Sequence, residues 1–275
     1  MANIPSAVSK RFSSAVPKFK RVLKRAKERD VNESDTVTIV TDMLEEIFGF
    51  DKYSEITREF SIQGTYCDLA VKSAKKVEYL IEVKAIGLSL SDNHLKQAVN
   101  YAAREGIKWI VLTNGIHWEV YRVSLEDRVH HEKLFDLDFA EINVRQKEAQ
   151  ETLFLLCKRG VQKDLIDEYY EYRQSVNRYT IGAMLLSDDV VSVIRRELRK
   201  VKSGVIADVD EIKHLLETEV LKRDILESAA GKEAIKELTK FKKKQAKAKS
   251  KARKTATPVQ NESNQPSQSS DFDSD

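Results

Sequence analysis

The feature that most constrains this 275-residue chain is a short apolar run with two charges on one side. Residues 79–84 read Tyr-Leu-Ile-Glu-Val-Lys, a composition typical of a buried β-strand. Because side chains alternate across a strand, Glu82 and Lys84 project from the same face. Burying a charge is costly unless it is paired. Either this face is exposed to solvent, or the two charges serve binding or catalysis.

The surrounding pattern predicts an α/β domain over residues 32–140. Asn32 is a suitable N-cap for a helix at 33–48, which Gly49 would end. Strands at 54–62, 67–71 and 78–84 would then form an antiparallel meander. A helix at 91–105 would cross over to a strand at 109–112, and Asn114-Gly115 predicts a hairpin to a strand at 116–123. The expected core is a mixed sheet flanked by helices.

The rest of the chain divides by composition. Residues 1–31 predict a basic N-terminal helix or arm, since residues 1–29 contain nine Lys or Arg and one acid. Apolar residues recur only with helical spacing from 145 to 240, which predicts an all-helical appendage that could hold a second copy or a partner subunit. The tail at 241–275 is basic, then acidic, without an apolar face, and is expected to be disordered. The basic segments could bind phosphate or could simply be solvated ends.

Three charged side chains suggest a site for cutting a phosphodiester. Asp68 begins one strand of the predicted meander and Glu82 ends its antiparallel partner, so both carboxylates can reach one metal ion. Mg²⁺ prefers oxygen ligands and usually takes one or two carboxylates from the protein. Lys84 lies on the same face as Glu82 and can stabilise developing negative charge. A Glu-x-Lys pair alone would fit an exposed strand face equally well.

A helix motif adds to this pattern. Gln97 and Tyr101 are four residues apart and therefore stack on one side of the predicted 91–105 helix, although a polar pair on a solvated face would look the same. The motif Asp68, fourteen positions, Ile81-Glu82-Val83-Lys84 and Gln97-x-x-x-Tyr101 resembles the PD-(D/E)xK nuclease superfamily. More narrowly, residues 32–123 resemble the N-terminal nuclease domain of type I restriction enzyme R subunits. Cys67 stands where this motif usually has proline.

The resemblance implies a restriction-endonuclease-like fold, with Asp68 and Glu82 as metal ligands, Lys84 as the catalytic lysine, and Gln97 and Tyr101 as supporting residues near DNA. It also implies a glutamate from the first helix, for which Glu33, Glu45 and Glu46 are available. The chain direction returns the start of that helix to the Asp68 edge, which favours Glu33. An acid in the first helical turn would also stabilise the helix dipole, so Glu33 has a second explanation.

The expected activity is a DNA endonuclease that uses Mg²⁺, with Mn²⁺ as a substitute. The alternative is a catalytically silent nucleic-acid-binding or scaffold protein that keeps the same fold. The sequence contains no Gly-x-x-x-x-Gly-Lys-Ser/Thr phosphate loop, so we expect no ATP site. Cys67 and Cys157 have no metal-ligand spacing, and no run of eighteen apolar residues occurs, which together favour a cytoplasmic protein.

Overall fold

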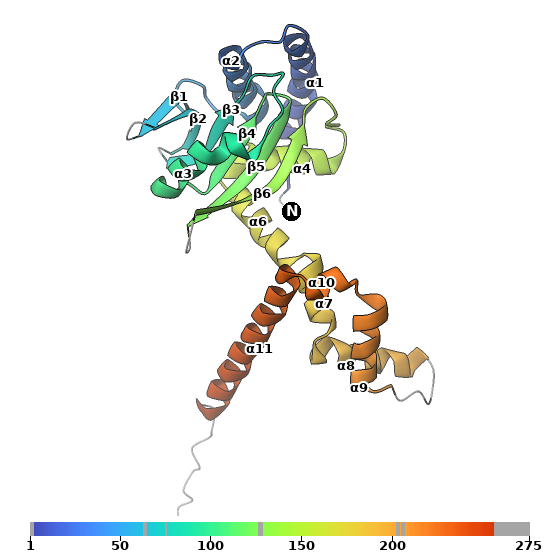
Figure 1. The fold of residues 1–275 in the computed structure, drawn as a ribbon. Coiled ribbons are helices and arrows are strands. Elements are labelled where there is room, and N and C mark those ends of the chain that lie inside the picture. Colours follow the sequence, from blue (N-terminus) through green and yellow to red (C-terminus); the bar gives the residue numbers. More distant parts are fainter. Residues whose placement is uncertain are drawn as a thin grey trace, which may run out of the picture. The chain divides into compact units, whose positions relative to one another are not determined.

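The computed structural model describes residues 3–62, 65–74, 76–125, 129–201, 204 and 207–255. The chain divides into two compact units, Met1–Tyr172 and Arg173–Asp275 (Figure 1). The first unit contains a β-sheet with helices on both faces, and the second is helical. The predicted α/β class with a C-terminal helical region is therefore confirmed.

The sheet has six strands that lie side by side in chain order. All neighbouring strands pair antiparallel except β3 and β4, which are parallel. The bounds are β1 (Ile56–Ile62), β2 (Thr65–Ser73), β3 (Lys76–Val83), β4 (Trp109–Thr113), β5 (His117–Leu125) and β6 (Val129–Asp138). The predicted meander and the hairpin at Asn114 are confirmed, whereas β6 was not predicted. Most of β6 is exposed or half-buried, so its sequence lacks the apolar alternation that identifies the other strands.

The parallel pair is joined by the predicted crossover. After β3 the chain forms a 3₁₀ turn, η2 (Asp92–Leu95), and then α3 (Lys96–Glu105), which ends at Gly106 with a left-handed φ of 67°. Helix α3 packs on one face of the sheet, where Leu80 and Leu112 contribute to the core. Because β3 and β4 are parallel, their C-terminal ends lie side by side at one end of the sheet.

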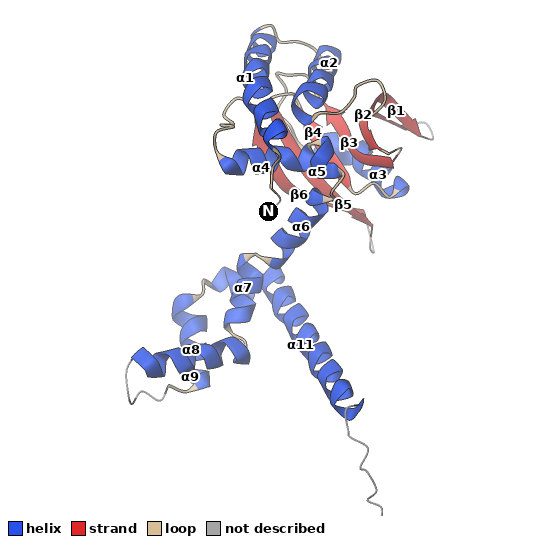
Figure 2. Cartoon of the chain, turned by 180° about the vertical axis from the view of Figure 1, so that it is seen from behind, coloured by secondary structure: helices blue, strands red, loops and turns tan. Residues whose placement is uncertain are grey.

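Helices α1 (Ser6–Glu28) and α2 (Glu33–Met43) cover the opposite face together with the π-helical turn η1 (Leu44–Phe48) (Figure 2). Phe12 and Phe19 on α1 are buried in the core that contains Trp118 of β5. Within the predicted N-terminal segment, the described residues 3–31 are therefore not a detached arm. Their apolar stripe provides cover that the sheet requires, and the positive charges occupy the outer side of the helix.

The first unit also extends past the expected boundary at residues 140–145. Helix α4 (Lys147–Leu156) buries Leu153, Phe154 and Leu156 in the same core as α1. The Tyr79 hydroxyl donates a hydrogen bond to the carbonyl of Leu156 at 3.0 Å. After α4 come α5 (Lys158–Val161) and α6 (Leu165–Ser175). The start of the predicted appendage thus belongs to the sheet-containing unit, because this apolar stripe completes its core.

The second unit is helical, with a small core of Val191, Ile212 and Leu216. Its elements are α7 (Arg178–Leu185), α8 (Asp188–Val201), α9 (Val209–Leu215), η3 (Leu216–Val220), α10 (Arg223–Glu227) and α11 (Ala229–Thr255). Because α11 continues to Thr255, the expected disorder of the tail is wrong for residues 241–255, whose Lys and Ala favour helix. Residues 256–275 lie outside the described part. Within the described residues, no helix has the length and apolar character needed to cross a membrane.

Candidate active site

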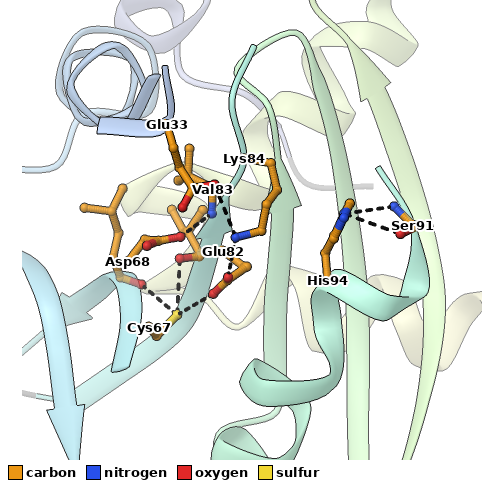
Figure 3. Close-up of polar contacts among 10 residues, drawn as sticks. Glu33, Cys67, Asp68, Glu82, Val83, Lys84, Ser91 and His94 are labelled. Carbon is orange, nitrogen blue, oxygen red and sulfur yellow. Dashed lines mark hydrogen bonds and ion pairs between the residues drawn. The ribbon is translucent and has the colours of Figure 1, made fainter. Parts of the chain in front are cut away.

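Asp68 is fixed at the point where β2 reaches the end of β3. The register pairs Leu69 with Ile81 and Ala70 with Leu80, which brings Asp68 to the end of β3. Its Oδ2 atom accepts a hydrogen bond from the backbone N–H of Val83 at 2.7 Å (Figure 3). One carboxylate is thereby attached to the strand that carries the other.

Glu82 and Lys84 form a close pair at this strand end. Lys84 Nζ donates to Glu82 Oε1 at 2.7 Å, and the two side chains are only 16% and 11% exposed, respectively. The backbone N–H of Lys84 donates to the carbonyl of Thr113 at 2.8 Å, so β4 also holds the lysine. The pair is therefore half-enclosed and held by two strands, unlike a flexible surface ion pair.

A third carboxylate reaches the same lysine from a helix. Glu33 is the first residue of α2, and its Oε2 atom lies 3.6 Å from Lys84 Nζ. The α2 start is fixed by Asn32, whose side chain accepts a hydrogen bond from the Asp35 N–H at 2.9 Å. The two other glutamates considered for this role are paired elsewhere, Glu45 with Lys52 and Glu46 with Lys18. Of the three glutamates, Glu33 is therefore the one that lies beside Lys84, as the chain direction predicted.

Burial and mutual repulsion shape the electrostatics of the group. Burial raises the pKa of Asp68, with a further contribution from Glu33, while Lys84 and the Val83 N–H oppose the shift. Burial also raises the pKa of Glu82, and Asp68 adds to this effect. Burial alone would lower the pKa of Lys84, but the hydrogen bond to Glu82 and the nearby carboxylates raise it. The site concentrates negative charge that a bound cation would neutralise.

The buried side chain of Cys67 lies next to Glu82. Its Sγ atom lies 3.2 Å from the carbonyl oxygen of Ile81, to which the thiol donates, and 4.0 Å from Glu82 Oε2. Burial, followed by the charges of Glu82 and Asp68, raises the pKa of this thiol to about 12. It therefore remains neutral next to the carboxylates. The replacement of the usual proline leaves Asp68 anchored, and the contact between Cys67 and Glu82 was not foreseen from the sequence.

Gln97 and Tyr101 separate in the structure. The Gln97 side chain is exposed, and among the described residues no hydrogen bond connects it to Asp68, Glu82 or Lys84. Tyr101 is only 4% exposed and packs edge-on against Phe60 with ring centroids 6.1 Å apart. Its hydroxyl is buried and, within the described part of the chain, unpartnered. The i and i+4 spacing predicted both residues on one side of α3. In the structure, Tyr101 is buried in the core, whereas Gln97 is exposed to solvent.

The donor set is suited to a hard divalent cation. Asp68 and Glu82 offer carboxylate oxygens from adjacent strands, while backbone and lysine hydrogen bonds engage one oxygen of each. The described residues contain no group of three or more His, Cys, Asp or Glu side chains arranged around a metal position. Two protein carboxylates are a ligand set that Mg²⁺ accepts in proteins, where the ion keeps several water or phosphate ligands.

A separate cavity of about 470 Å³ lies between α4 and α6 and is lined by none of these residues. Its polar rim includes Glu148, Glu151 and Glu168, so it would repel a phosphate chain.

Residues 40–137 match the family model described as the type I restriction enzyme R protein N terminus. About a third of the chain is therefore similar to that family region, as the motif predicted. The matched segment contains Asp68, Glu82 and Lys84 but begins after Glu33. No curated protein and no solved structure matches this chain.

Proposed function

We propose that this chain is a Mg²⁺-dependent DNA endonuclease of the PD-(D/E)xK type, acting in restriction or DNA processing. The observation that carries the proposal is the convergence of Asp68, Glu82 and Lys84 at one half-buried strand end. The similarity of residues 40–137 to the R protein N terminus supports it independently.

The three residues would have distinct roles. Asp68 and Glu82 would hold the ion, and a bound Mg²⁺ supplies Lewis acidity and a water of lowered pKa. Hydrolysis adds a water oxygen to phosphorus and breaks one P–O bond, leaving a phosphate monoester and a hydroxyl group. The Lys84 ammonium can donate a hydrogen bond to the phosphate oxygen that gains negative charge. Glu33 would orient Lys84 through the 3.6 Å contact.

Metal-dependent cleavage tests the proposal. Supercoiled plasmid should be nicked or linearised by the wild-type chain in Mg²⁺ or Mn²⁺ and left intact in EDTA. Asp68→Asn and Glu82→Gln preserve side-chain shape but remove negative charge, so each should lower the rate by roughly a hundred-fold or more.

Glu78→Gln is the matched control, because Glu78 lies on the same strand and pairs with Lys76 instead. Its cleavage rate should equal that of the wild type. Wild-type protein that binds plasmid but leaves it intact in both metals overturns the proposal and supports the catalytically silent alternative.

A further inference from the structure

The basic residues of α1 fall into two groups. Arg11 donates to the carbonyls of Ile47 and Phe48, Lys18 pairs with Glu46, and Lys20 donates to the carbonyl of Ala140. These three fasten the helix to the unit. The remaining cations are exposed, and no ion pair is found for them within the described residues: Lys10, Arg21, Lys24, Arg25, Lys27 and Arg29. Four of these six occur between residues 24 and 29.

The C-terminal end of α1 lies near the C-terminal ends of β3 and β4, where the candidate site is found. A Cβ atom added to Gly87, three residues after Lys84, would lie 2.5 Å from Asp30 Oδ1. A Cβ on Gly115, in the turn after β4, would lie 3.1 Å from the Leu23 side chain. Glu33, four residues past Arg29, already contacts Lys84 (Figure 3). The loop after β3 thus lies against the α1–α2 turn, and the turn after β4 lies against the last turns of α1.

Helical periodicity identifies which of these cations lie on the α2 side. Arg11 and Lys18 are seven residues apart and both contact η1, the continuation of α2. Arg25 is seven residues further along and therefore lies on the same side of α1. Arg29 follows it by four residues at the C-cap. Arg21, four residues before Arg25, lies on this side as well but one turn further from Glu33. Arg25 and Arg29 are therefore the exposed cations on this side that lie closest to the α1–α2 turn.

We propose that Arg25 and Arg29 bind backbone phosphates of a DNA duplex whose scissile bond lies at Lys84. This inference rests on the proposed function for the identity of the polyanion. The carboxylates at the centre of the site repel DNA, so binding energy must come from cations around them. Glu28 and Asp30 offset part of the charge, but no ion pair with them is found among the described cations.

Stabilisation of the α1 C-terminus is the competing explanation, because cations in a last helical turn interact favourably with the helix dipole. The two explanations differ in what they predict for salt dependence. A phosphate contact releases counterions, so each lost contact reduces the slope of log K against log salt by about 0.9 for duplex DNA. A cation that only stabilises the helix does not affect this slope.

The test compares two double variants of the full chain by fluorescence anisotropy with a labelled duplex in EDTA over a salt series. Arg25→Gln/Arg29→Gln should reduce the slope by about 1.8 and weaken binding by about ten- to sixty-fold near 0.1 M salt. The control, Arg104→Gln/Arg159→Gln, removes two exposed arginines near the opposite edge, where α3 ends and β1 begins. It should keep the wild-type slope.

Urea unfolding of both variants verifies that they are folded. A wild-type slope in Arg25→Gln/Arg29→Gln overturns the inference, as does an equal loss in the control pair. The result is separable from the nuclease test. If the wild-type chain cleaves DNA and the Arg25→Gln/Arg29→Gln variant keeps the wild-type salt slope, only the inference is removed. If the wild-type chain never cleaves DNA but the Arg25→Gln/Arg29→Gln variant still binds with a reduced slope, the inference is supported and only the proposed catalysis is removed.

Discussion

Strand β3 carries a Lys–Glu pair at each end, and the two pairs differ mainly in burial. Lys76 and Glu78 are 3.2 Å apart, with the lysine side chain 72% exposed and the glutamate side chain 16% exposed, so the contrast in burial lies in the lysines. Glu82 and Lys84 are 2.7 Å apart, with both side chains largely shielded from water. The second pair also has Asp68 and Glu33 beside it.

The difference in burial matters because an exposed ion pair costs little free energy to form, whereas a shielded ion pair carries a desolvation cost. An exposed ion pair contributes between about 0 and 1 kcal/mol, because water screens it. A shielded pair must recover the desolvation of both charges, and removing one partner leaves the other buried. Here burial raises the pKa of both Asp68 and Glu82, so the carboxylates oppose folding at neutral pH. Such arrangements are concentrated at functional sites.

The largest contrast between the two ends should be in catalysis. Lys84→Met removes the cation while keeping an extended side chain, and plasmid cleavage should fall by roughly a hundred- to a thousand-fold. Lys76→Met makes the same change at the exposed end and should leave the rate within a factor of two. Initial rates in Mg²⁺ on both variants, with circular dichroism to verify folding, measure the contrast.

Equal losses in the two lysine variants would break the comparison, since the exposed end would then matter as much as the buried end. A fully active Lys84→Met chain would show that the shielded lysine has no part in the chemistry.

A smaller contrast should appear in stability. Asp68→Asn keeps an oxygen for the Val83 N–H and removes a charge that the fold disfavours. In EDTA at neutral pH this variant should be more stable than the wild type by about 0.5–2 kcal/mol. A raised folded-state pKa means that the wild type loses stability as pH rises through that pKa. The advantage should therefore shrink towards about pH 4, near the pKa of an unfolded aspartate.

Urea unfolding between pH 4 and 8, with EDTA and then with Mg²⁺, measures this effect. Mg²⁺ should narrow the difference, because it binds the folded wild type in preference to the unfolded chain. A variant that is less stable than the wild type at pH 7 in EDTA would show that Asp68 stabilises the fold.

The smallest effect is expected at the exposed end. Lys76→Ala/Glu78→Ala removes the whole pair, and the free energy of unfolding should change by less than about 1 kcal/mol. The same urea experiment at neutral pH measures it. A loss of several kcal/mol would mean that burial does not distinguish the two pairs.

Much of the site could be predicted from the sequence because its positions follow from strand geometry. The meander fixed the neighbourhood of Asp68 and Glu82, and chain direction brought Glu33 to Lys84. The hairpin was predictable because Asn114 Oδ1 accepts from the N–H groups of Ile116 and His117, while Gly115 adopts a φ of 85°. Each of these depends on residues close in the chain or on adjacent strands.

The errors concern contacts between distant segments. Helix α1 has the sequence of an amphipathic basic helix. Phe12 is fully buried because α1 packs on a face of the sheet that would otherwise be exposed to water. Tyr101 stays predicted as a supporting residue near DNA, but the packing of its ring against Phe60 of β1 was not foreseen. Strand β6 exists because β5 offers an unpaired edge, which leaves no apolar pattern in β6 itself. Long-range packing of this kind has no local signature in the sequence.

The core shared by α1 and α4 has a practical consequence for fragment design. A fragment cut to residues 40–137 would keep Asp68, Glu82 and Lys84 but lose Phe12, Phe19 and Phe154 from the face that they cover. The aromatic side chains of Trp118 and Phe48 would then be exposed to water, which favours aggregation. The segment that matches the family model is therefore only part of the folding unit, and its ends are not the ends of that unit. A fragment intended to retain the site should extend from α1 to Tyr172.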